Sequence, residues 1–131
     1  MGLYVYRSNK TISFVEKIWV LDLKLILDKT KSHYISVSDA EGKIIDSLEE
    51  NNFDFKDEIS KGSDFFLKSA SDFFEKVISE KDLQYVTLSS NETNILFIKD
   101  SSEKLVFSIY TKNEISPSIV KFIIEKYARN N

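Results

Sequence analysis

Residues 33–47 read HYISVSDAEGKIIDS, and this stretch decides the fold. Polar and apolar residues alternate along His33–Ser38, which is typical of a strand with one buried face. The acidic segment Asp39–Gly42 then separates it from a second strand-like segment, Lys43–Leu48. Glycine at the end of such a turn supplies the positive φ that a tight connection needs. The stretch therefore predicts a β-hairpin.

A long helix is predicted after the hairpin. Residues 49–58 form an acidic, polar linker, and the helix is expected from about 58 or 63 to 80, with Ser63 or Asp64 as its N-cap. Its apolar positions recur at helical spacing: Phe66, Ala70, Phe73, Phe74, Val77 and Ile78, broadened by Phe65 and Leu67.

Three further strands and a closing helix follow. The strands are predicted at Leu83–Ser89, Asn94–Lys99 and Lys104–Thr111. Their short, turn-rich connectors make neighbouring strands antiparallel. The pair Ser116-Pro117 predicts a helix start, because proline at the first turn costs no hydrogen bond.

A first helix is predicted ahead of the hairpin, over residues 12–29. Ser13 and Glu16 have the spacing of a capping box. Phe14, Ile18, Leu21 and Leu25 recur at helical spacing, although Trp19–Leu21 is also compatible with a strand. Residues 3–6 have strand-like composition.

The resulting order is α-β-β-α-β-β-β-α, which predicts an α+β fold. We expect one domain over residues 1–131, with a core at 12–129 and an N-terminal extension at 1–11.

Composition limits the class of protein. The net charge is −3, so no strongly basic face for nucleic acid is indicated. The absence of cysteine excludes disulfides and thiolate metal sites. The longest apolar stretch, residues 18–27, is interrupted by Asp22 and Lys24 and is half the length of a membrane span. We therefore expect a cytoplasmic protein without stable membrane insertion.

No pattern in the chain predicts catalysis. His33 is the only histidine, and we interpret its role as structural or on the surface, not catalytic. The acidic residues near 49–58 lack the spacing of a calcium loop, and three glycines cannot build a phosphate-binding fingerprint. The sequence thus predicts neither an enzyme nor a cofactor or metal.

Adjacent aromatic pairs on the long helix are the most informative surface feature. Phe65-Phe66 and Phe73-Phe74 point about 100° apart within each pair, so the stripe spans more than one face. Either all four rings lie in the core, or one face covers the sheet and the other meets a partner.

From the first helix to the last, over roughly residues 12–129, the chain resembles the roadblock (dynein light-chain roadblock-type) domain. The segment that carries the resemblance is His33–Ser47, supported by the order and spacing of the later elements. The resemblance implies a roadblock/profilin-like five-stranded antiparallel sheet with one helix on one face and two on the other. It further implies pairing through the second helix and the third strand of that sheet.

The expected interface combines the apolar helix with a strand that carries no charge. Its residues are Phe65, Phe66, Ser69, Phe73, Val77, Gln84, Tyr85, Val86, Thr87 and Leu88. An uncharged edge of this kind is a liability in a monomer.

The resemblance implies a non-enzymatic adaptor. It would form a homodimer, or a heterodimer with another roadblock protein, and bind a Ras-like small GTPase or scaffold a GTPase- or motor-associated complex. The alternative hypothesis is a small acidic protein that binds and neutralises a toxin or enzyme.

Overall fold

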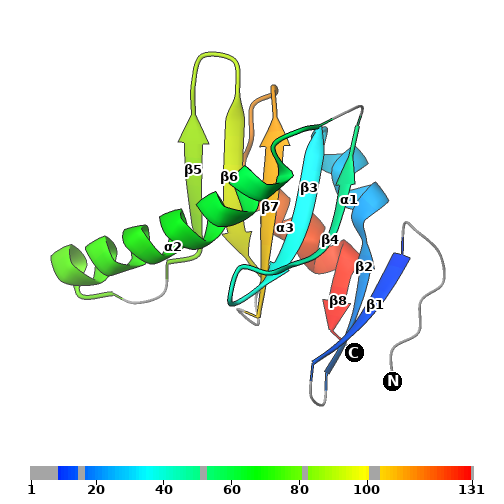
Figure 1. Ribbon diagram of the computed structural model, residues 1–131, viewed down its shortest axis with the longest axis horizontal. Coiled ribbons are helices and arrows are strands. Elements are labelled where there is room, and N and C mark those ends of the chain that lie inside the picture. The colour runs from blue at the N-terminus through cyan, green and yellow to red at the C-terminus, as the bar shows by residue number, and fades with distance from the viewer. Residues whose placement is uncertain (1–8, 15–16, 51–52, 81–82, 101–103, 131) are drawn as a thin grey trace.

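The protein is described here from a computed structural model that covers residues 9–14, 17–50, 53–80, 83–100 and 104–130. A five-stranded antiparallel sheet forms its centre, with the strand order β4-β3-β7-β6-β5 (Figure 1). The strands are β3 (Tyr34–Asp39), β4 (Ile44–Glu49), β5 (Tyr85–Ser89), β6 (Asn94–Lys99) and β7 (Leu105–Thr111). The predicted strands are confirmed to within two residues at each end.

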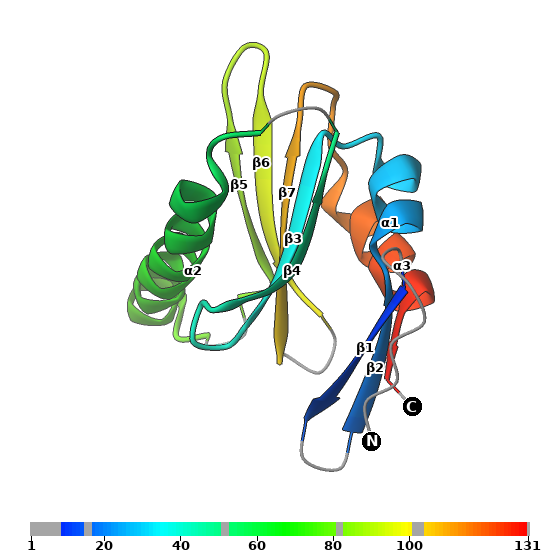
Figure 2. The ribbon, with the colours of Figure 1, turned by 45° about the vertical axis from the view of Figure 1, so that its right-hand side comes forward.

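Helices cover both faces of this sheet. Helix α2 (Lys56–Ile78) lies on one face, and α1 (Leu23–Thr30) and α3 (Pro117–Tyr127) lie on the other (Figure 2). The larger apolar core joins the sheet to α1 and α3, whereas a smaller one joins it to α2 through Ile59 and Leu67. The predicted α+β arrangement, with one helix on one face and two on the other, is confirmed.

The β3–β4 hairpin forms as the sequence predicts. Gly42 has a φ of +87°, and the Asp39 carboxylate accepts hydrogen bonds from the backbone N–H groups of Glu41 (3.0 Å) and Lys43 (2.9 Å). A Cβ atom at Gly42 would lie 3.2 Å from the Cβ atom of Asp64 on α2. Glycine is therefore required here both by the backbone conformation and by the closeness of the helix.

The prediction of a helix over residues 12–29 is wrong for its first half. Asn9–Phe14 forms β1 and Lys17–Asp22 forms β2, an antiparallel hairpin in which Ser13 lies opposite Ile18. The helix starts only at Leu23, and its N-cap is Asp22, whose carboxylate accepts from the Leu25 N–H at 3.2 Å. Ser13 therefore caps no helix, and its predicted partner Glu16 lies outside the described residues.

A third strand completes a small second sheet. β8 (Ala128–Asn130) follows α3 directly and pairs with β2, giving the order β1-β2-β8. Tertiary pairing from both sides thus favours the extended conformation of β2, which Trp19–Leu21 also tolerates. The expected core boundary at residue 12 falls within β1, and the strand-like residues 3–6 lie outside the described residues.

Helix α2 begins earlier than predicted. It starts at Lys56 after Phe55, whose side chain makes no capping hydrogen bond, and Ser63 is buried in the middle of the helix. The N-cap assignment to Ser63 or Asp64 is therefore wrong. The start of α2 is tied to the end of β4 by an ion pair between Lys56 and Glu49.

Helix α3 starts at Pro117, as predicted. The Ser116 hydroxyl accepts a hydrogen bond from the Ile119 N–H at 3.5 Å.

Candidate interaction surface

Helix α2 is longer than the part of it that the sheet supports. Its buried residues are Ile59, Ser63 and Leu67, and none of the residues from Lys68 to Ile78 is buried. That second half is about 16 Å long at 1.5 Å per residue. Figure 1 shows it passing beyond β5, the last strand of the sheet. The C-terminal half of α2 is therefore an overhang whose end lies beyond the sheet of its own chain.

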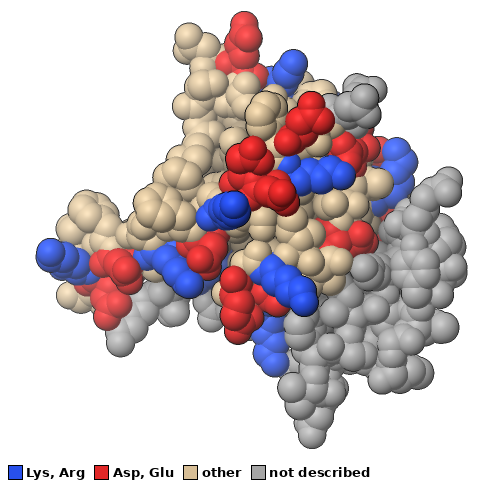
Figure 3. Space-filling model, in the orientation of Figure 1, with Lys and Arg blue, Asp and Glu red and all other residues tan. Residues whose placement is uncertain are grey.

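The exposed surface of α2 is divided into two flanks of different chemistry. Residues spaced by three or four share one side of a helix. The apolar flank comprises Phe65, Phe66, Ser69, Phe73 and Val77, the charged flank comprises Asp57, Lys61, Asp64, Lys68, Asp72 and Glu75, and the exposed Glu58 and Lys76 lie along the border between them. Figure 3 shows uncharged side chains along the upper side of α2 and over β5 and β6, and charged ones along its lower side.

The aromatic residues of the apolar flank are largely open to solvent. Phe65 and Phe73 are 62% and 67% exposed, and Val77 is 61% exposed. Phe66 is 37% exposed and stacks on Phe97 of β6, with ring centroids 6.2 Å apart. The interpretation in which all four phenylalanines lie in the core is therefore wrong, because Phe65 and Phe73 are exposed.

The predicted residues of β5 lie next to the overhang, at the open edge of the sheet. β5 pairs only with β6 among the described strands. Tyr85 is 45% exposed, whereas Val86, Thr87 and Leu88 are half-buried. Gln84 precedes the strand, and its side-chain oxygen accepts a hydrogen bond from the Lys121 ammonium of α3 at 2.9 Å. The fold thus brings the two predicted segments together.

The opposite edge of the sheet, β4, is chemically protected. The Asp46 carboxylate accepts a hydrogen bond from the Ser47 N–H at 2.9 Å, and Glu49 carries a second charge on the same strand. The β3–β4 register also shifts between Val37 and Ser38. Charges and irregularities of this kind discourage strand addition. β5 has neither, so the two edges are not equivalent.

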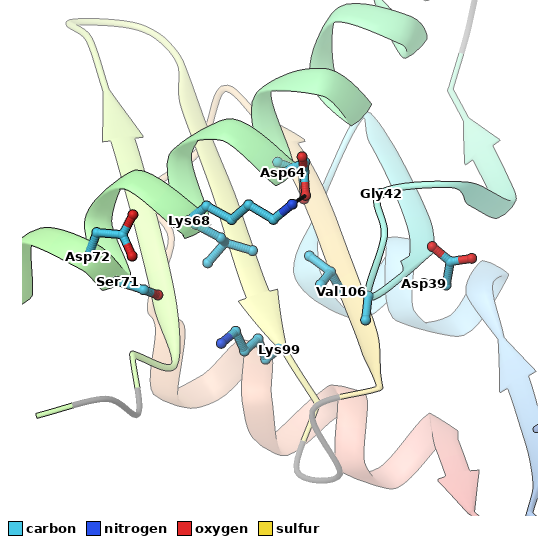
Figure 4. A pocket seen from close by; sticks show the side chains of 11 residues that line it. Asp39, Gly42, Asp64, Lys68, Ser71, Asp72, Lys99 and Val106 are labelled. Atoms are coloured by element: carbon cyan, nitrogen blue, oxygen red, sulfur yellow. Dashed lines mark ion pairs between the residues drawn. The ribbon is translucent and has the colours of Figure 1, made fainter. Parts of the chain in front are cut away.

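A pocket of about 280 Å³ lies on the charged side of α2, between the helix and the β3–β4 turn (Figure 4). Asp64 and Lys68 form an ion pair of 3.2 Å at its rim, and Asp72 and Lys99 also face it. Leu67 and Val106 supply apolar lining. Its lining therefore carries charges of both signs.

Among the described residues, His33 and the acidic side chains considered in the sequence form no catalytic or metal-binding cluster. His33 lies 3.7 Å from a Glu50 carboxylate oxygen and packs edge-on against Tyr110. Among the described residues, no group of three or more His, Asp or Glu side chains is placed to hold a metal ion. No helix within the described ranges is long and apolar enough to cross a membrane.

Among the described residues, five exposed large apolar side chains were not part of the predicted surface: Leu25, Phe55, Ile78, Ile119 and Phe122. Ile78 belongs to the overhang and is 52% exposed, and Phe122 on α3 is 67% exposed on the other side of the sheet. The helical spacing of Ile78 was visible in the sequence. Its exposure depends on where the sheet ends beneath α2, which no local pattern reports.

Comparison with known proteins identifies the architecture. No family model and no curated protein matches the sequence. Several solved structures match the fold. A roadblock/LC7 domain from Streptomyces avermitilis has a TM-score of 0.64 and 8% identity, over 79% of this chain and 88% of that one. The gliding protein MglB from Thermus thermophilus has a TM-score of 0.59 and 12% identity, over 80% and 78%.

MglB from Myxococcus xanthus has a TM-score of 0.56 and 16% identity, over 78% of this chain and 81% of that one. At these identities the likeness concerns the fold. The shared architecture agrees with the resemblance carried by residues 33–47. The chain is therefore built on the roadblock/LC7 fold.

Proposed function

We propose that this protein is a non-enzymatic dimeric adaptor that binds a Ras-like small GTPase or scaffolds a GTPase- or motor-associated complex. The observation that carries the dimer is the overhang of α2, whose exposed apolar flank lies beside the unprotected edge strand β5. The GTPase is inferred from the resemblance to roadblock domains, which serve as platforms for such proteins. A further solved structure with this fold is of MglB in a tetrameric arrangement, so self-association occurs on this fold.

A single partner can cover the apolar flank of α2 and also pair with the open edge of β5. A two-fold axis perpendicular to the sheet, passing beside β5, places the β5 strands of two chains edge to edge and antiparallel. The same rotation keeps both α2 helices on one face. Each overhang then lies above the sheet of the other chain, where Leu88 and Ile95 are only partly buried on the α2 side.

The energy available at one aromatic residue is large. A phenylalanine side chain offers roughly 200 Å². Phe73 is 67% exposed, so about 130 Å² remains to be buried, which corresponds to about 3 kcal/mol per chain. Association entropy and desolvation offset part of this gain. A charge at the same position would be buried without a partner, which adds a further cost.

Light scattering during size-exclusion chromatography tests the dimer. We expect the wild type to elute at twice its 15.2 kDa chain mass and Phe73→Asp to elute as a monomer. Phe122→Asp is the matched control, because Phe122 is equally exposed (67%) but lies on α3, on the other face of the sheet. The control should remain dimeric. A wild type that is monomeric at high micromolar concentration would contradict the proposed dimer.

A separate experiment tests the partner. Purified Ras-like GTPases are loaded with GDP or with a non-hydrolysable GTP analogue and passed over the immobilised chain. Nucleotide-dependent retention by the wild type supports the proposal, and the hydrolysis rate then separates a regulator from a scaffold. Any acceleration would come from positioning the GTPase's own residues. Absence of binding in both nucleotide states would contradict the proposal of a GTPase partner but not the proposal of a dimer.

A further inference from the structure

We infer that β5 pairs with β5 of a second copy of this chain in one register, centred on Thr87. The inference rests on the dimeric part of the proposed function and specifies its partner and its geometry. Three features of the strand carry it: the direction of its backbone groups, its length and the environment of the Thr87 hydroxyl.

The backbone groups that face outward from β5 are set by its pairing with β6. The Lys99 N–H donates to the Gln84 carbonyl at 3.0 Å, and the Ser90 N–H donates to the Thr93 carbonyl at 2.8 Å. Alternate residues of a strand direct their backbone groups to opposite sides. Val86 and Leu88 therefore bond to β6, whereas the N–H and C=O groups of Tyr85, Thr87 and Ser89 point away from the sheet.

The length of the strand selects among the possible registers. β5 contains five residues, and Thr87 is the middle one. With the two-fold axis at Thr87, Tyr85 lies opposite Ser89 of the second copy, and three pairs exchange about six hydrogen bonds. A centre at residue 86 places Ser89 opposite residue 83, and a centre at residue 88 places Tyr85 opposite residue 91. Both of those residues lie outside the strand, so each shift removes about two hydrogen bonds.

The side chains agree with the central register. Val86 lies opposite Leu88 of the second copy, on the face that α2 covers. No charged residue of β5 meets a like charge, since Tyr85–Ser89 contains none. The pairing therefore joins apolar groups on one face and hydroxyl-bearing groups on the other.

The Thr87 hydroxyl supplies an independent observation. Its oxygen is buried and has no hydrogen-bond partner among the described residues, although the residue as a whole is only half-buried. A buried hydroxyl without a partner costs roughly 1–3 kcal/mol. With the axis at Thr87, the two threonines lie directly opposite each other, with Cβ atoms about 5 Å apart. A rotation about χ1 then lets one hydroxyl donate to the other.

Because the chain contains no cysteine, single cysteines report the register directly. A disulfide needs Cα atoms within about 7 Å of each other. Opposite residues of antiparallel strands are about 4.5–5.5 Å apart. Thr87→Cys should therefore cross-link to itself under mild oxidation. Val86→Cys alone should not, since its Cα would lie about 8 Å from its copy, two residues along the partner strand.

Mixed chains complete the test. Val86→Cys mixed with Leu88→Cys should give a heterodimeric disulfide, whereas Leu88→Cys alone should not cross-link. Self-cross-linking of Val86→Cys or of Leu88→Cys would overturn the register while leaving the dimer intact. If all the variants are dimeric by light scattering but none cross-links, the inference fails and the dimer uses another surface. If the wild type is monomeric, the failure belongs to the proposed function.

Discussion

Two glycine-to-alanine substitutions should change stability in opposite directions. Gly62 lies inside α2, and Gly42 lies in the β3–β4 turn with a φ of +87°. The space around each position differs as well. A Cβ atom at Gly62 would lie 3.7 Å from the nearest ring atoms of Phe66 and Phe97, which is ordinary van der Waals contact. A Cβ atom at Gly42 would lie 3.2 Å from Asp64, which forces a displacement.

The expected magnitudes follow from this geometry. Alanine in a helix interior is favoured over glycine by about 0.5–1 kcal/mol, because glycine loses more backbone entropy on folding. Gly62→Ala should therefore raise the unfolding midpoint by about 2–5 °C for a chain of this size. Alanine in the left-handed region costs about 1–2 kcal/mol. Gly42→Ala should lower the midpoint by at least as much as Gly62→Ala raises it.

The assay is thermal and urea unfolding followed by circular dichroism, for the wild type and both variants. All three samples must have one protein concentration, because the midpoint of a dimer depends on concentration. The reasoning is refuted if Gly62→Ala lowers the midpoint, or if both substitutions shift it in the same direction. Either result would mean that helix α2 does not have the described backbone and packing at Gly62.

Three other changes probe the core and the ionisable groups. Leu67→Ala should cost about 2–5 kcal/mol in urea unfolding, because Leu67 is only 6% exposed in the core between α2 and the sheet. The pKa of the Glu49 carboxyl is lowered, first by the hydrogen bond from Lys56 and then by the hydrogen bond from the Phe53 N–H. The ionised carboxylate therefore stabilises the folded state fully above the ordinary carboxyl pKa, and this stabilisation is lost as the pH falls. Glu49→Gln should therefore flatten the decline in unfolding midpoint between about pH 5 and pH 3; an unchanged decline contradicts this. Burial raises the pKa of the Tyr34 hydroxyl. The neutral hydroxyl therefore stabilises the folded state below the ordinary tyrosine pKa, and this stabilisation is lost as the pH rises. Tyr34→Phe should reduce the fall of the unfolding midpoint above about pH 10.

Local rules predict most of the central sheet. The β3–β4 turn follows from Gly42, and the start of α3 follows from Pro117, since both residues restrict the backbone within one turn. The helix predicted over residues 12–29 fails over residues 12–22 for the opposite reason. Its conformation depends on pairing with β8, more than a hundred residues later, and short apolar runs fit a helix and a strand equally well.

The interaction surface is predictable only in part. The sequence identifies an apolar helix and an uncharged strand, and the fold brings them side by side. Whether Phe73 is a core residue or a surface residue depends on where β5 ends beneath α2, and no helical period contains that information. The orphaned Thr87 hydroxyl is likewise visible only once its neighbours are in place.

The small β1-β2-β8 sheet has a consequence for the order in which the chain folds. β1 and β2 are adjacent in sequence and can pair early, but β8 reaches β2 only after α3 has docked, because α3 and β8 are continuous. Closing so long a loop carries an entropic cost that the three residues of β8 must offset. The last strand is therefore expected to form late and to open first. Amide hydrogens in Ala128–Asn130 should exchange faster than those in β6 and β7, where opening requires the loss of the main core.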